Sequence, residues 1–145
     1  MSTVSETIHV PAPVDEVFGF LDDPDNHMAV TPSIANIDNV ERLENGGKRL
    51  DHTFRRAGVP LDGELVQTAH EPDERMVFEM RGRLEGEIEL QFEAEDGGTR
   101  LTYAATYEIP GNVLSAVAEP FARRYNEREL RTTLENVQTH FELAD

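Results

Sequence analysis

Apolar residues recur at steps of three and four positions toward the end of the chain, which predicts one long helix from Asn112 to Asp145. The apolar stripe consists of Val113, Val117, Phe121, Leu130, Leu134, Val137 and Phe141. The charged positions between them, which are expected to face water, are Arg123, Glu127, Glu129, Arg131 and Glu135. Asn112 is expected to cap the first turn, while Pro120 predicts a kink near Glu119 or a short helix followed by a longer one.

The N-terminal part of the chain changes its period after the first strand. Residues Thr3 to Val10 alternate between apolar and polar side chains, which predicts a half-buried strand. From Val14 to Asp22 the period becomes helical, with Val14, Val17, Phe18 and Leu21 on the apolar face. The segment from Asp25 to Pro32 is weakly patterned and is compatible with a second short helix.

Alternation at a period of two dominates the middle of the chain and predicts six strands joined by turns. The strands are Ile34–Glu44, Lys48–Ala57, Leu61–His70, Arg75–Arg81, Leu84–Glu95 and Thr99–Ile109. The turns are Asn45-Gly46-Gly47, Gly58-Val59-Pro60, Pro72-Asp73 and Asp96-Gly97-Gly98. In the clearest strand, Ile88, Leu90, Phe92 and Ala94 oppose Glu85, Glu87, Glu89, Gln91 and Glu93. Such an antiparallel sheet has one dry face, and the long helix is expected to cover it.

The inward side chains of this sheet are mostly apolar with a few polar groups among them. The apolar ones are Met76, Phe78, Met80, Ile88, Leu90, Phe92, Leu101 and Ile109, and the polar ones are His52, Gln67, Tyr103 and Tyr107. Small-molecule pockets have this composition. A solid core is the alternative, in which the two tyrosine hydroxyls reach water or the backbone.

The charge balance is strongly acidic, with 29 Asp and Glu against 13 Lys and Arg and a formal net charge of -16. Nucleic acid is not an expected partner, because phosphate binding needs clustered basic residues. Lys48 is the only lysine. This composition resembles that of proteins from salt-accumulating halophiles, in which high salt screens the self-repulsion; an ordinary acidic protein is the alternative.

The remaining composition narrows the chemistry further. The chain has no cysteine, which excludes a disulfide framework, a thiolate metal site and a cysteine nucleophile. Its histidines are scattered, it has no phosphate-binding loop and no G-x-S-x-G motif, and so neither a metal nor another cofactor is expected. Its 145 residues carry no apolar run long enough for a membrane span and no signal peptide pattern. A single cytoplasmic domain over residues 1–145 is expected.

Five short stretches, taken in order, resemble the polyketide cyclase/dehydrase-like branch of the START-like (SRPBCC) superfamily. They are Ile8–Phe18, Leu21–Asp25, Glu71–Arg75, Asp96–Thr102 and Tyr107–Gly111. The resemblance implies an α+β helix-grip (START-like, Bet v 1-like) fold. In this fold a curved antiparallel sheet of about six to seven strands surrounds a long C-terminal helix, with one or two short helices after the first strand. Many relatives carry a tryptophan after the Asp-Pro segment, whereas this chain has none.

The resemblance implies binding of a hydrophobic small molecule, such as a lipid, isoprenoid, quinone or polyketide-like compound, between the sheet and the C-terminal helix. The predicted ligand contacts are His52, Phe54, Gln67, Phe78, Met80, Leu90, Phe92, Tyr103, Ala105, Tyr107, Phe121 and Tyr125. One alternative is an enzyme of the cyclase or dehydratase type, in which His52 and either Tyr103 or Tyr107 move protons. Another is an interaction protein of the toxin-like or chaperone-associated START-like type. The oligomeric state is not predicted.

Overall fold

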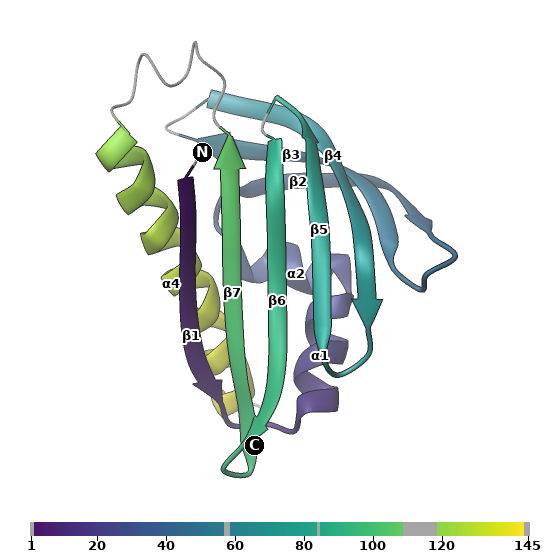
Figure 1. Ribbon diagram of the computed structural model, residues 1–145, viewed down its shortest axis with the longest axis vertical. Helices are drawn as coiled ribbons and strands as arrows, with labels where there is room; N and C mark the ends of the chain where they lie inside the picture. The colour runs from purple at the N-terminus through teal and green to yellow at the C-terminus, as the bar shows by residue number, and fades with distance from the viewer. Residues whose placement is uncertain (1, 57–58, 84, 109–118, 144–145) are drawn as a thin grey trace.

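The chain folds into one seven-stranded antiparallel sheet with three described helices, as a computed structural model shows (Figure 1). The structure describes residues 2–56, 59–83, 85–108 and 119–143, apart from the side chains of Ser2, Arg56, Val59, Tyr107, Glu108 and residues 119–123. The elements are β1 (Ser2–Val10), α1 (Val14–Asp22), α2 (Pro24–Val30), β2 (Ile34–Arg42), β3 (Lys48–Arg56), β4 (Val59–Glu71), β5 (Arg75–Gly82), β6 (Glu85–Glu95), β7 (Gly98–Glu108) and α4 (Glu119–Leu143). The predicted α+β class and helix-grip arrangement are confirmed.

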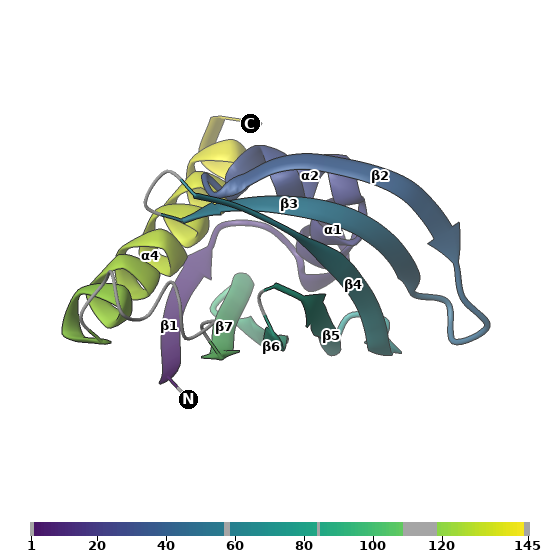
Figure 2. The ribbon, with the colours of Figure 1, turned by 90° about the horizontal axis from the view of Figure 1, so that it is seen from above.

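The sheet is strongly curved, and its strand order is β1-β7-β6-β5-β4-β3-β2. Seen from above, β2, β3 and β4 bend away from the other strands, so that the sheet curls around α1 and α2 (Figure 2). Helix α4 runs along the β1 side of the sheet (Figures 1 and 2). Among the described residues, no helix is long and apolar enough to cross a membrane.

Most predicted turns are present where the sequence places them. The turn between β6 and β7 has positive φ angles at Asp96 (46°) and Gly97 (77°), as a two-residue hairpin with the right twist requires. The turn prediction for Val59 and Pro60 is wrong, because both residues already pair with β3 as the first residues of β4. Proline is tolerated at the start of a strand, where its missing N–H costs little. Gly58 lies outside the described residues.

The predicted inner face of the sheet is buried. Its buried residues include Leu50, Phe54, Leu61, Leu65, Met76, Met80, Ile88, Leu90, Phe92, Leu101 and Ala105, and α1 adds Val17, Phe18 and Leu21. Ala94 is an exception, since it is exposed although the alternation predicted it to face inward. It lies one residue before the end of β6, next to the hairpin turn and outside the hydrophobic core.

Helix α4 buries Leu130, Leu134 and Val137 as predicted. The prediction for Glu129 is wrong: this side chain is buried and accepts a hydrogen bond from the buried hydroxyl of Ser33. Pro120 occupies the first turn of the described helix, where a proline is tolerated. Of the other predicted helix positions, Asn112, Val113 and Val117 lie outside the described residues, as do the side chains of Phe121 and Arg123.

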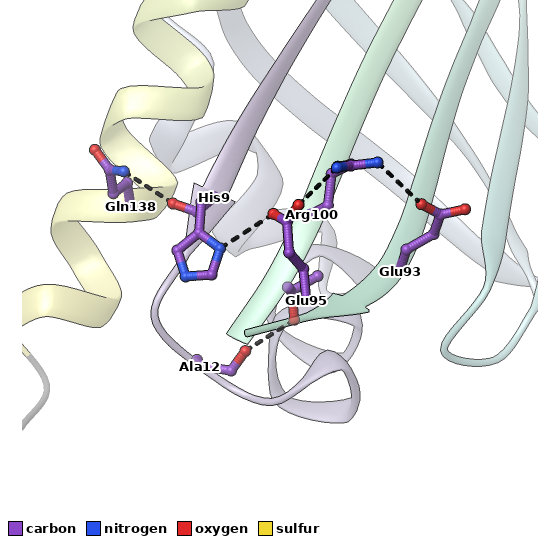
Figure 3. A network of polar contacts seen from close by, with 7 residues as sticks. His9, Ala12, Glu93, Glu95, Arg100 and Gln138 are labelled. Atoms are coloured by element: carbon purple, nitrogen blue, oxygen red, sulfur yellow. Dashed lines mark hydrogen bonds and ion pairs between the residues drawn. The ribbon is translucent and has the colours of Figure 1, made fainter. Parts of the chain in front are cut away.

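A polar network fixes α4 to β1 and to the β6–β7 hairpin (Figure 3). The Gln138 amide donates to the backbone oxygen of His9 (2.8 Å), and His9 Nδ1 lies 3.3 Å from Glu95 Oε2. Arg100 donates to Glu95 (2.6 Å) and forms a longer ion pair with Glu93 (3.7 Å). The position of α4 beside the sheet is therefore set by polar contacts as well as by its apolar stripe.

Candidate functional site

A small cavity of about 40 Å³ lies between the inner face of the sheet and the helices α1 and α2. Its lining consists of Leu21, Asp22, Pro24, His27, Met28, Ile34, Ile37, Lys48, Leu50, Phe54, Leu65, Gln67, Phe78, Ile88 and Tyr103. The sequence predicted a cavity between the sheet and the C-terminal helix, but no described side chain of α4 contributes to this lining. The wall is mostly apolar and carries a few polar groups.

Helix α2 forms one wall of the cavity because it begins immediately after α1 ends. The side chain of Asp23 caps it by accepting from the backbone N–H of Asp25 (2.9 Å), and Pro24 occupies its first turn. This start places His27 and Met28 in the cavity wall. The weak apolar pattern of the segment did not predict either contact.

His27 and Tyr103 are hydrogen-bonded across the cavity wall, with His27 Nε2 3.1 Å from the tyrosine hydroxyl. The bond joins α2 to β7 over a separation of 76 residues. Burial lowers the pKa of His27 to about 4, so the imidazole is neutral at neutral pH. The sequence pointed to Tyr103 but paired it with His52, and it assigned no role to His27.

Gln67 is the buried amide of the cavity, with 2% of its surface exposed. Its Oε1 accepts a hydrogen bond from the backbone N–H of Lys48 (3.0 Å). Its Nε2 has no hydrogen-bond partner in the described structure. Gln67 therefore has an N–H donor without a described acceptor in a mostly apolar wall.

The charged groups that line the cavity are already paired with one another. Lys48 Nζ donates to the backbone oxygen of Asp22 (3.0 Å) and lies 3.7 Å from its carboxylate. The same carboxylate is 3.0 Å from His70 Nε2. Because Asp22 is the last residue of α1, the only lysine of the chain stabilises the carboxyl end of that helix.

His52, the histidine that the sequence favoured, is buried on β3 with 3% of its surface exposed but does not line the cavity. Its ring packs against Phe54 at a centroid distance of 4.5 Å. Neither ring nitrogen has a hydrogen-bond partner among the described residues. Burial lowers its pKa to about 4, against the opposing effect of the carboxylates of Asp51 and Asp62.

The other predicted ligand contacts fall into four groups. Phe54, Gln67, Phe78 and Tyr103 line the cavity. Met80, Leu90, Phe92 and Ala105 are buried in the core but do not line it. Tyr125 is 41% exposed, and its hydroxyl donates to the backbone oxygen of Arg55 (3.3 Å). The side chains of Tyr107 and Phe121 lie outside the described part of the structure.

Asn126 is a buried polar residue that the sequence reasoning missed. It is fully buried on α4, and neither its amide oxygen nor its amide nitrogen has a described partner. It lies four residues before Leu130, on the same side of the helix as the apolar stripe. A polar residue at a stripe position is the signal that would have identified it. No group of three potential metal-binding side chains occurs within the described ranges.

Comparisons with known proteins agree with this architecture. Residues 1–142 match the family described as polyketide cyclase / dehydrase and lipid transport. A START superfamily protein from Mycobacterium smegmatis superposes with a TM-score of 0.83 at 13% identity, covering 100% of both chains. A conserved protein from Geobacillus kaustophilus gives 0.80 at 15% identity, over 98% of this chain and 96% of the other.

The di-domain ARO/CYC StfQ from the steffimycin biosynthetic pathway is similar over half of its length. It gives a TM-score of 0.75 at 18% identity, over 98% of this chain and 51% of that chain. No curated protein matches the sequence. At such low identities these structures establish the fold, while the site has to be interpreted from its own residues.

Proposed function

The chain belongs to the polyketide cyclase/dehydrase and lipid transport family, and we propose that it binds a hydrophobic small molecule in the cavity enclosed by the sheet, α1 and α2. The lining supports this role, because it combines apolar side chains with a few polar groups. Apart from the ion pair of Lys48 and Asp22, the polar groups in the lining are the Gln67 amide and the hydrogen-bonded pair of His27 and Tyr103.

The Gln67 amide nitrogen, which has no hydrogen-bond partner among the described residues, is the observation that carries the proposal. A buried donor without an acceptor costs about 1–3 kcal/mol of folding free energy. A ligand oxygen placed against Gln67 Nε2 would remove this cost, whereas a fully packed core would leave it in place. A hydrogen bond to Gln67 Nε2 would therefore favour ligand binding in addition to the apolar contacts.

The cavity must widen when the ligand enters. Its volume of about 40 Å³ accommodates a few water molecules, whereas pockets for drug-sized ligands measure about 300–1,000 Å³. Helix α2 is the natural element to move, because it is only seven residues long. It is held by the bond between His27 and Tyr103 and by Asn136, which donates to the backbone oxygen of Val30 (3.0 Å). Met28 of α2 lines the cavity, and its unbranched side chain can change rotamer to fit a ligand.

Organic extraction and mass spectrometry of protein from its native host test the proposal. The wild type is expected to yield a hydrophobic compound in stoichiometric amount. Ile88→Phe adds volume to the cavity wall and is expected to yield none, since Ile88 is buried and lines the cavity. Glu87→Phe is the matched control, because the preceding residue of β6 is exposed. Equal amounts in both variants would place the compound elsewhere, and an empty wild type would contradict binding.

An enzyme of the cyclase or dehydratase type is the second candidate, and the hydrogen bond between His27 and Tyr103 favours it. The pair places an imidazole and a hydroxyl in the cavity wall, where both could take part in proton transfer. Binding ranks first because a base whose pKa is lowered to about 4 accepts protons poorly at neutral pH.

If the cavity is catalytic, the compound extracted from Tyr103→Phe protein is converted when it is incubated with the wild type. A dehydratase lowers its mass by one water, and a cyclase changes its chromatographic retention at equal mass. Tyr103→Phe is then expected to stop this conversion while the compound remains bound, because the substitution removes only the hydroxyl. A compound that the wild type leaves unchanged would argue against catalysis and would leave the binding role intact.

A further inference from the structure

We infer that the ligand is a neutral carbonyl compound whose oxygen accepts hydrogen bonds from the Gln67 amide nitrogen. The inference rests on the proposed binding function and names the class of molecule that this cavity takes. It follows from the direction of one hydrogen bond, from the pairing of the charges around the cavity and from the row of side chains beside Gln67.

The direction of the Gln67 amide is fixed by its neighbour. The backbone N–H of Lys48 can only donate, so the side-chain atom 3.0 Å from it has to be the amide oxygen. The NH₂ group of Gln67 must therefore point away from Lys48. Its nitrogen is buried, and no described residue accepts from it. Gln67 lines the cavity, so a ligand group that reaches this nitrogen as the cavity widens has to be an acceptor.

The surrounding charges favour a neutral acceptor over a carboxylate. Lys48 is the only permanently cationic side chain in the lining, and it already contacts both the backbone oxygen and the carboxylate of Asp22. A ligand carboxylate would have to compete with Asp22 for that ammonium group while lying close to its negative charge. A buried charge without its own partner is costly, so an uncharged oxygen fits this wall better.

The row of side chains next to Gln67 is suited to the apolar body of such a molecule. In the sheet, Gln67 is paired with Phe78, which is paired in turn with Ile88. All three line the cavity, and Leu50 and Leu65 extend the apolar wall. A molecule lying along this row would place its hydrocarbon part on Phe78 and Ile88 and its carbonyl oxygen at Gln67.

Three naphthalene probes of similar size test the inference: methyl naphthyl ketone, isopropylnaphthalene and naphthoate. Their binding can be followed by isothermal titration calorimetry, which reads all three probes in the same way. The wild type is expected to bind the ketone about tenfold more tightly than the hydrocarbon, which is the effect of one neutral hydrogen bond to a buried donor. The anionic naphthoate is expected to bind most weakly.

Substitution of Gln67 should remove the preference for the ketone while leaving binding of the hydrocarbon. Gln67→Met deletes the amide at a similar side-chain length. Gln67→Leu also lacks any hydrogen-bond donor and carries the test if Gln67→Met does not fold. Gln91→Met is the matched control, because Gln91 is exposed on β6. It should retain the tenfold preference of the wild type.

Other outcomes separate the inference from the function on which it rests. Equal affinity of the wild type for ketone and hydrocarbon would overturn the inference and leave the binding function standing. Tightest binding of naphthoate would overturn it in favour of an anion site at Lys48. If none of the three probes binds, the proposed function itself is contradicted, and the inference falls with it.

Discussion

Lowering the pH from 7 to 5 is expected to reduce the free energy of unfolding by about 2 kcal/mol through His52 alone. This loss of stability corresponds to a melting temperature lower by about 6 °C. Burial lowers the pKa of His52 from 6.5 to about 4. At a pH between these two pKa values, the imidazole of His52 is protonated in the unfolded chain and neutral in the folded chain. The stabilisation is therefore complete above pH 6.5 and is lost as the pH falls toward 4.

The charged groups near His52 limit this effect but do not reverse it. Asp51 and Asp62 both favour the protonated imidazole, and the backbone of Glu64 acts in the same direction. Burial outweighs them, because His52 is only 3% exposed and removing its charged form from water is the largest effect on its pKa. His27 adds a contribution of the same sign, since burial also lowers its pKa to about 4.

Thermal unfolding of His52→Leu at both pH values isolates the contribution of this residue. The variant is expected to lose less stability between pH 7 and pH 5 than the wild type, because it has no imidazole to protonate at that position. His140→Leu serves as the control, since His140 is exposed, and it should follow the wild type. The same loss in His52→Leu and in the wild type would show that other groups cause the acid sensitivity.

Asn126→Leu is expected to stabilise the protein by about 1–3 kcal/mol, which is a rise in melting temperature of about 3–9 °C. Most substitutions in a core are destabilising. Here the native side chain is fully buried and has two polar atoms without described partners. An apolar side chain removes that cost and continues the stripe formed by Leu130, Leu134 and Val137.

The same substitution at another position of α4 should have the opposite effect. Asn136 is exposed and donates to the backbone oxygen of Val30 (3.0 Å), so Asn136→Leu is expected to cost about 1 kcal/mol. A lower melting temperature for Asn126→Leu would mean that its amide is satisfied in solution, for example by water. A more stable Asn126→Leu that no longer retains the extracted compound would extend the ligand site to α4.

The faces of the strands were predictable because alternation depends on local geometry. Ile88, Leu90 and Phe92 face inward and alternate with exposed or half-buried polar residues, and a strand places successive side chains on opposite faces. The hairpin at Asp96 and Gly97 was predictable for the same reason, since its residues favour positive φ. The fold class followed from the order of these local elements.

Contacts between distant elements were not predictable from the sequence. Glu129 belongs by its chemistry to the solvated face of α4, yet it is buried because the start of β2 brings Ser33 against that helix. The bond between His27 and Tyr103 depends on how α2 lies across the sheet, which no periodicity specifies. The sequence therefore named several cavity residues, such as Gln67 and Tyr103, without the partners that define their chemistry.

The pairing of the first strand with the last has a consequence for synthesis on the ribosome. β1 lies at the edge of the sheet, and among the described strands it pairs only with β7. Thr3 contacts Thr106 across 103 residues, so β1 leaves the ribosome long before its partner strand exists. Until then Val4 and Val10, which are buried in the finished fold, have no place to pack. We expect the nascent chain to depend on chaperones during this interval, with the sheet closing only after β7 has emerged.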